Sequence, residues 1–280
     1  MPRRRLTPGL LSTAAAVALL VPAAPAWTPT LEVGTGFNDN ANYATRQQKS
    51  DTATTASLDI SRLRGLNGDW QFLVGARAQT SAWWQYSGLN LTELGAQGLL
   101  RRKFGLGPYA PRLDLRAGFA HQFSRVGGWS GNWLRAGTAL HRRFTPQWEA
   151  SLAGEYNRLY AHRDVYAIAT RSVSARVDFD PDADWRLSLS LRYLGGDQLS
   201  WCRASWPQFA GTHPWLDGIF GGDWFPYQER AHQVAASLDL ARALGPRTTI
   251  ALGGDVSHAR SAAGHIYRRQ ILRLQLIHAF

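Results

Sequence analysis

The clearest pattern in the chain is an alternation of apolar and polar residues. Residues 185–193, W-R-L-S-L-S-L-R-Y, place apolar side chains at odd positions and arginine or serine at even ones. A strand puts alternate side chains on opposite faces, whereas a helix would spread the arginines around its circumference. The segment is therefore predicted to be a strand with one apolar and one polar face.

The same alternation recurs along the rest of the chain. A strand that crosses a bilayer needs roughly 9–11 residues, with apolar side chains outward and polar or small ones inward. The expected fold is all-β: a transmembrane antiparallel up-and-down β-barrel of about twelve strands, an even number that leaves both ends on one side. The predicted strands are 27–43, 52–64, 70–84, 89–104, 112–125, 132–144, 148–160, 166–179, 185–194, 229–242, 248–260 and 266–280.

Short turns fall at every second connection between these strands. They are rich in Gly, Pro, Asn and Asp, which favour tight turns. Short turns of membrane barrels face the periplasm and longer loops face outside. The segments expected in the periplasm are 65–69, 145–147, 180–184 and 245–247; those expected outside are 44–51, 85–88, 126–131, 161–165, 195–228 and 261–265.

Aromatic residues flank the short turns. Tryptophan directly follows three of them, and phenylalanine closes three of the strands. Aromatic rings repeated at one height are typical of the girdle at a membrane interface. The residues are Trp70, Trp148 and Trp185, and Phe104, Phe144 and Phe179.

The first 26 residues have the features of a secretory signal peptide. Three arginines at 3–5 precede an apolar run at 10–22, and A-P-A at 24–26 is a small-x-small cleavage pattern. The apolar run is too short for a membrane-spanning helix, which needs about 20 residues. We expect 1–26 to be a signal peptide and 27–280 to be the barrel.

Composition and charge narrow the alternatives. After residue 26 no stretch approaches the roughly 18 apolar residues of a membrane helix, and the mean hydropathy is −0.27, which excludes a helical membrane protein. The formal net charge is +11. An exported chain without a basic cluster on an aromatic platform is not expected to bind nucleic acid. Arginine would serve equally in a barrel lumen or against anionic lipopolysaccharide.

The C-terminal segment is the most specific feature. Residues 271–280 read I-L-R-L-Q-L-I-H-A-F, and the leucines share one face with Phe280. This last strand resembles the signature by which proteobacterial outer-membrane β-barrel proteins are recognised by their insertion machinery. The resemblance implies a location in the cell outer membrane and makes Phe280 the insertion signal. It also implies outer-membrane lipid, lipopolysaccharide and the insertion machinery as partners.

The polar faces of the predicted strands carry both signs of charge. These side chains would line the lumen, either as a transverse field that sorts solutes in a water-filled pore or as ion pairs that fill a narrow barrel. Both interpretations stay open. The lumen-lining candidates are Arg77, Glu93, Arg101, Asp114, Arg116, Arg135, Glu149, Glu155, Arg176, Asp178, Arg186, Arg192, Asp239, Asp255 and Arg273.

Residues 36–42, G-F-N-D-N-A-N, end the first predicted strand. With the tail that begins at Tyr267-Arg268-Arg269, they are similar to the barrel domain of the surface lipoprotein assembly modifiers. That resemblance implies an export role with a periplasmic export partner. The sequence shows no helical-repeat domain of the kind those proteins usually carry. Ordinary turn formation at a strand end explains the same residues without an export role.

The connection 195–228 is longer than any other and rich in aromatic residues. A loop of this length usually has a function or is disordered, and its aromatic content argues against disorder. It is expected to constrict or plug the barrel, to bind an apolar or sugar ligand, or to pack on itself as a cap. Its candidates are Trp201, Trp206, Trp215, Trp224 and Phe225. Cys202, the single cysteine, cannot form a disulfide within the chain.

No motif in the sequence identifies an enzyme. The histidines are scattered, and G-x-S-x-G, H-x-x-x-H and C-x-x-C spacings are missing, so no catalytic residue, metal site or cofactor is predicted. The expected function is that of a channel, or of the outer-membrane component of a transport or export system. The alternatives are a structural or surface-interaction barrel with a closed lumen and a lipid-modifying outer-membrane enzyme.

Overall fold

A computed structural model of the protein describes residues 27–203 and 216–280. The predicted signal peptide and two of the loop candidates, Trp206 and Trp215, lie outside the described residues. The strands are β1 (Thr28–Asn38), β2 (Asp51–Gly65), β3 (Trp70–Trp83), β4 (Leu91–Lys103), β5 (Arg112–Ser124), β6 (Gly131–Arg143), β7 (Trp148–Ala161), β8 (Ala169–Phe179), β9 (Trp185–Arg203), β10 (Trp224–Gly245), β11 (Thr248–Ser261) and β12 (Ile266–Ala279).

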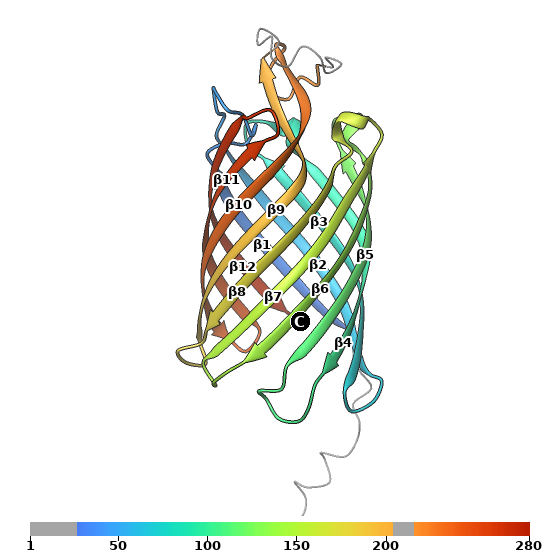
Figure 1. The fold of residues 1–280 in the computed structure, drawn as a ribbon, viewed down its shortest axis with the longest axis vertical. Coiled ribbons are helices and arrows are strands. Elements are labelled where there is room, and N and C mark those ends of the chain that lie inside the picture. The colour runs from blue at the N-terminus through green and yellow to red at the C-terminus, as the bar shows by residue number, and fades with distance from the viewer. Residues whose placement is uncertain (1–26, 204–215) are drawn as a thin grey trace, which may run out of the picture.

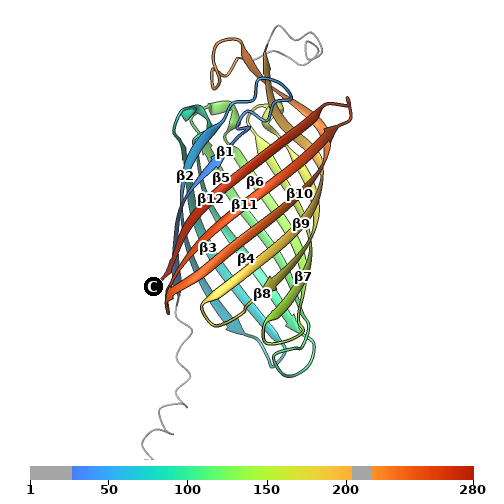
Figure 2. The ribbon, with the colours of Figure 1, turned by 90° about the vertical axis from the view of Figure 1, so that its left-hand side faces the viewer.

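These twelve strands form one closed antiparallel barrel, so the predicted fold class is confirmed. Each strand pairs with its sequence neighbours, and β1 pairs with β12 from Thr30↔Ala279 to Asn38↔Ile271 to close the sheet. Figures 1 and 2 show steeply tilted strands around a single axis. No helix in the described part of the chain is long and apolar enough to span a membrane.

The two ends of the barrel differ in their connections (Figure 1). We call the end where β1 starts and β12 finishes the turn end; four of its five connections have five residues or fewer. The opposite end, the loop end, carries the longer connections and three short 3-10 turns: η1 (Ser87–Leu89), η2 (Gly127–Trp129) and η3 (Asp164–Tyr166). The turn end is the one whose turns the sequence predicts to face the periplasm.

Alternate side chains of each strand face outward and inward, in the register that the sequence predicts. On β9, Leu187, Leu189 and Leu191 are exposed on the outer surface, whereas Ser188 is buried inside. Exposed apolar side chains of the neighbouring strands continue this outer surface around the barrel. Exposure of so many leucines to water would be unfavourable, but it is what a lipid-facing surface requires. The barrel therefore belongs in an outer membrane, as predicted.

Outward-facing aromatic side chains form a girdle at the turn end. Trp148 and Phe179, paired across β7 and β8, stack with ring centroids 4.5 Å apart. The guanidinium of Arg102 lies over both Trp70 and Phe104, at 5.2 and 5.0 Å from the ring centroids. Aromatic rings and arginines that reach toward the headgroups are the usual composition of a membrane interface.

The strands differ from the predicted ones mainly at the loop end. β1 ends at Asn38 rather than 43, and β9 and β10 continue to Arg203 and from Trp224, so much of the predicted connection 195–228 is a paired ribbon. The first four residues of β10, W-F-P-Y, are all buried. Packing on both faces removes the period-two pattern on which the prediction relied. Gly196, with a φ of +140°, takes a conformation that other residues avoid, at the point where the ribbon leaves the barrel.

Candidate functional site

Glycines on the lumen face alternate with long polar side chains of neighbouring strands. Gly75 of β3 pairs with Gln97 of β4, which pairs with Gly118 of β5, which pairs with Arg135 of β6. Gly95 is also held close to β5, because a Cβ there would lie 2.6 Å from the Cβ of Ala120. Small residues beside large ones leave space inside the barrel.

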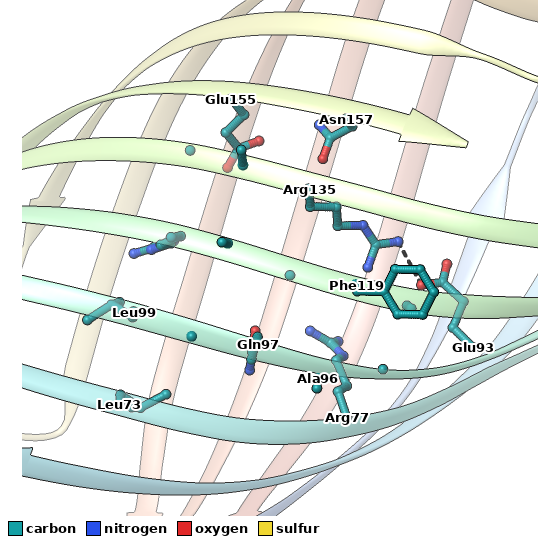
Figure 3. Close-up of a pocket in the computed structure, with 18 residues that line it drawn as sticks. Leu73, Arg77, Glu93, Ala96, Gln97, Leu99, Phe119, Arg135, Glu155 and Asn157 are labelled. Carbon is teal, nitrogen blue, oxygen red and sulfur yellow. Dashed lines mark hydrogen bonds and ion pairs between the residues drawn. The ribbon is translucent and has the colours of Figure 1, made fainter. Parts of the chain in front are cut away.

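That space is a cavity of about 560 Å³ against the lumen face of β3 to β7 (Figure 3). Leucines form its floor toward the turn end, and charged and amide side chains form the rest of its wall. The side chains that line it include Leu73, Arg77, Glu93, Gln97, Leu99, Arg116, Arg135, Glu155 and Asn157. Five of the predicted lumen residues, Arg77, Glu93, Arg116, Arg135 and Glu155, are therefore brought together around one cavity.

The other charged candidates also lie on the lumen side of their strands, and most of them are paired. Asp114 is fully buried and accepts two hydrogen bonds from Arg101, at 2.8 and 2.9 Å. Arg116 and His141 lie 3.6 Å from the same carboxylate. A buried carboxylate with this many donors keeps its charge without opening the barrel to water.

A second set of ion pairs continues this chain of charges toward the turn end. Glu149 accepts from Arg112 at 2.7 Å and lies 3.4 Å from Arg143. Arg143 also reaches Asp180, which accepts from Arg186 at 2.7 Å. Asp180 lies in a turn outside the membrane-spanning segments, and the hydrogen bond from Arg186 lowers the pKa of its carboxyl.

The remaining predicted pairs lie within one strand or on strands that are neighbours or next neighbours. Arg135 and Glu93 are 2.6 Å apart (dashed line in Figure 3). On the opposite wall Arg273 bridges two acids from β10 and β11. The further pairs are Arg176–Asp178 at 2.8 Å, Arg273–Asp239 at 2.6 Å and Arg273–Asp255. The charges are thus arranged along the wall, not as two opposed rows across the lumen.

Two of the predicted lumen charges lack a partner within the part of the chain that the structure describes. Glu155 and Arg192 make no hydrogen bond or ion pair with residues 27–203 or 216–280. Arg192 faces the lumen, because its strand neighbours Leu191 and Tyr193 face the lipid, and its side chain is exposed there. These two charges are available to a solute in the lumen.

An apolar cluster covers the lumen at the loop end. We call it the mouth cluster. It is built from residues of several separate connections and strand ends. Their aromatic rings pack edge-on and face-on across the opening. Its buried members are Ala44, Leu89, Tyr166, Trp201, Ile219, Phe220 and Trp224, and Trp83, Tyr86, Val126 and Trp129 pack against them.

One carboxylate holds the mouth cluster together. Asp217 accepts hydrogen bonds from the Tyr166 hydroxyl at 2.8 Å and from the Trp201 indole at 2.7 Å. Its other oxygen accepts from the backbone N–H of Ile219 at 3.0 Å. Burial, reinforced by the neighbouring Asp217 charge, raises the pKa of Tyr166. The segment that begins at 216 is therefore fixed over the barrel opening.

A polar network links the extended β9–β10 ribbon to β12. The hydroxyls of Tyr227 and Tyr267 are 2.9 Å apart, and Tyr267 and His265 both contact Glu229, at 3.1 and 2.7 Å. Cys202 is fully buried beside Tyr227, and its burial raises the thiol pKa to about 12. The thiol is therefore protonated and inert at neutral pH.

The asparagines of the first loop form its turn. Asn40 donates to the carbonyl of Ala44 and accepts from the Ala44 N–H, and Asn42 accepts from the backbone N–H of Lys49. The Asn42 carbonyl accepts from the Trp201 N–H at 3.0 Å. The 36–42 motif therefore builds a loop that packs against the mouth cluster.

Sequence reasoning missed most of the mouth cluster. Trp201 and Trp224 were candidates and lie in it, whereas Phe225 packs with Cys202 in a separate cluster on the ribbon. Asp217 and Tyr166 were not singled out. The available signal was a single carboxylate inside an aromatic stretch, W-L-D-G-I-F at 215–220.

Comparisons with known proteins support the fold. The sequence matches no family model and no curated protein. An outer membrane channel from Pseudomonas putida F1 superimposes with a TM-score of 0.61 at 10% identity, over 91% of this chain and 96% of that chain. The outer membrane phospholipase of Salmonella typhi (15% identity, 91% of each chain) and an anion-selective porin from Comamonas acidovorans (11%, 92% and 99%) reach 0.45 and 0.40. The first likeness shows a shared barrel fold, and the other two are too distant to support more.

Proposed function

We propose that the protein is an outer-membrane channel for small polar solutes, with its turn end in the periplasm. The observation that carries this proposal is the cavity of about 560 Å³ in the lumen, lined by charged and amide side chains. A barrel that served only as a scaffold would have little reason to place glycines opposite long polar side chains and leave water-sized space between them.

The arrangement of charges indicates how the channel would treat solutes. Most acids and arginines neutralise each other along the wall, so a passing solute meets few unbalanced charges. Arg192 and Glu155 are the exceptions among the lumen candidates named from the sequence and would interact with charged solutes directly. The mouth cluster would limit the size of solute that enters from the loop end.

Conductance in a planar bilayer tests the proposal. The wild-type protein is expected to give discrete ionic steps, and Arg192→Glu is expected to shift the selectivity toward cations. Arg242→Gln is the matched control, because this arginine faces outward over the Trp185 ring and not into the lumen. Silence at high protein load, with folded barrel in the membrane, would contradict the channel.

A second candidate is a structural barrel with a closed lumen. It is favoured by the mouth cluster and by the dense wall of ion pairs around Asp114. The bilayer measurement separates it from the channel. A role as the outer-membrane part of an export system, with a periplasmic partner, rests only on the resemblance of 36–42 and 267–269 to lipoprotein assembly modifiers.

We also propose that the insertion machinery recognises the last strand through Phe280. Its ring faces outward at the turn end, and its N–H donates to the Pro29 carbonyl at 3.0 Å, so it sits where the barrel closes. Phe280→Ala is expected to lower the amount of folded protein in the outer membrane. Unchanged levels of the heat-modifiable form would contradict this role.

A further inference from the structure

Two cross-strand pairs of basic residues face outward at the loop end of β10 to β12. His232 of β10 pairs with Arg260 of β11, and His258 of β11 pairs with Arg268 of β12. All four side chains are exposed on the lipid-facing side, in line with the outward Val234 and Val256. They form one continuous surface, which we call the basic patch.

Among the described residues, the arginines of the basic patch lack the acidic partners that the lumen arginines have. Arg260 and Arg268 are diagonal neighbours on β11 and β12, and their like charges repel each other. The lumen arginines Arg101, Arg135 and Arg273 each have an acidic partner within 2.8 Å. Within residues 27–203 and 216–280, by contrast, Arg260 and Arg268 have no carboxylate within ion-pair distance. An external anion would remove this repulsion.

The patch lies at the height of a lipid headgroup. Ile250 of β11 pairs with Arg242, whose guanidinium rests on the Trp185 ring of the turn-end aromatic girdle. His258 is eight positions further along the strand. At about 3.4 Å per residue and a tilt near 40°, that is roughly 20 Å above the girdle, close to the apolar thickness of an outer membrane.

The spacing of the arginines suits a phosphate group. Arg260 and Arg268 occupy diagonal positions on β11 and β12, with Cα atoms about 7–8 Å apart, so both guanidiniums can reach one anion. Arginine binds phosphate through two parallel hydrogen bonds and is less hydrated than lysine. His232, which is held by the Tyr193 hydroxyl at 2.7 Å, adds a further polar group beside them.

Below the patch small residues interrupt the outward leucines. Gly254 faces outward between Leu238 and Leu272, and a Cβ there would meet nothing closer than 3.9 Å. The outward position next to it on β10 is Ala236, paired with Val256. An acyl chain could pack against this apolar surface without meeting a bulky side chain at Gly254.

The basic residues are confined to one side of the barrel. Outward positions in the loop-end half of β7 and β8 add Arg158 and Arg171. The corresponding positions of β1 to β6 carry no lysine or arginine. A general attraction to an anionic leaflet would not require this asymmetry, whereas a localised lipid site would.

We propose that the basic patch binds a phosphate group of the outer-leaflet glycolipid, lipopolysaccharide, with one acyl chain against the outer surface at Gly254. The proposal depends on the loop end facing outside and is independent of whether the lumen conducts. The lipid would then neutralise the two arginines and fix one side of the barrel in the outer leaflet.

Native mass spectrometry of the folded barrel tests the site. The probe is purified lipid A with two phosphates, compared with the same lipid after removal of its phosphates and with phosphatidylglycerol. Wild-type protein is expected to retain the phosphorylated lipid A at least about tenfold more than the dephosphorylated lipid, since the charge-assisted bonds to phosphate are then lost. It is also expected to retain lipid A more than phosphatidylglycerol, whose single phosphodiester carries one charge. Equal retention of all three lipids would overturn the proposal.

Variants of the patch locate the binding. Arg260→Gln with Arg268→Gln is expected to lower retention of lipid A about tenfold or more. Arg142→Gln with Arg242→Gln removes two outward arginines of the turn end and is expected to leave retention unchanged. Equal loss in both double variants, or no loss in the first, would overturn the assignment to this patch. The comparison of lipids on the wild-type protein decides the question if a variant folds poorly.

Discussion

At the turn end of the barrel the large aromatic side chains point out toward lipid, and at the loop end they point in across the lumen. Trp148 at the turn end is 44% exposed in the isolated barrel, whereas Trp201 at the loop end is 3% exposed. The outward rings contact only their strand neighbours and nearby arginines. The inward rings hold together segments that are distant in the sequence.

The difference shows how each end obtains its stability. Most connections of the turn end are short and make their own hydrogen bonds, as where the Asn67 side chain accepts from the N–H groups of Asp69 and Trp70. The loop end instead depends on one cluster and on Asp217, to which several connections contribute. Changes at the turn end should therefore stay local, whereas changes at the loop end should spread.

Trp201→Ala should have the largest effect. Removing a fully buried tryptophan costs about 3–5 kcal/mol, and the loss should loosen the mouth cluster while the barrel remains folded. Channel conductance should rise, and the loop end should become susceptible to protease in vesicles. Trp148→Ala, at the outward aromatic girdle, is the control and should change neither. An unaltered conductance in Trp201→Ala would show that the cluster does not restrict the lumen.

Leu189→Arg tests the surface between the two ends. The side chain is 58% exposed on the lipid face, and an arginine near the middle of the bilayer costs about 2–4 kcal/mol. Ser190→Arg is the matched control, since this side chain faces the lumen. Folding yields in lipid vesicles should fall for the first and change less for the second. Equal losses would contradict the strand register.

The same contrast explains what could be predicted from the sequence. Strand alternation and turn residues are local, and β3, β5 and β7 start at the predicted residues, 70, 112 and 148. The mouth cluster is not local, because Leu89, Tyr166 and Ile219 come together only when the barrel closes. No spacing rule connects residues from separate loops, so their grouping could not be predicted from the sequence.

The lumen charges fall between these two cases. Their inward direction follows from alternation, and the structure places each candidate on the inner face. Their pairing does not follow, because it depends on the register between strands. Arg101 meets Asp114 only because β4 and β5 pair these two positions directly. The choice between a transverse field and wall ion pairs therefore required the structure.

Asp217→Ala should have an intermediate effect on the loop end. It removes the acceptor for both the Tyr166 hydroxyl and the Trp201 indole, and buried groups left unpaired cost about 1–3 kcal/mol each. Conductance should rise, though less than in Trp201→Ala. Asp223→Ala is the control in the same segment, because its carboxylate is 52% exposed and pairs only with Arg203 among the described residues. A larger effect of Asp223→Ala would show that another contact fixes the segment.

The smallest effect is expected for the ion pair at the turn end. The Arg186 hydrogen bond lowers the pKa of Asp180, so the pair adds stability above about pH 4, near the ordinary Asp pKa, and loses it as the pH falls through the lowered value. The thermal midpoint of wild-type barrel in vesicles should therefore fall below about pH 4. Arg186→Gln should reduce that fall and slightly lower the midpoint at neutral pH. Arg242→Gln removes an arginine from the outer face at the same end and should leave the acid response intact. An identical acid response in wild-type and Arg186→Gln protein would show that the turn-end charges are too well solvated to contribute.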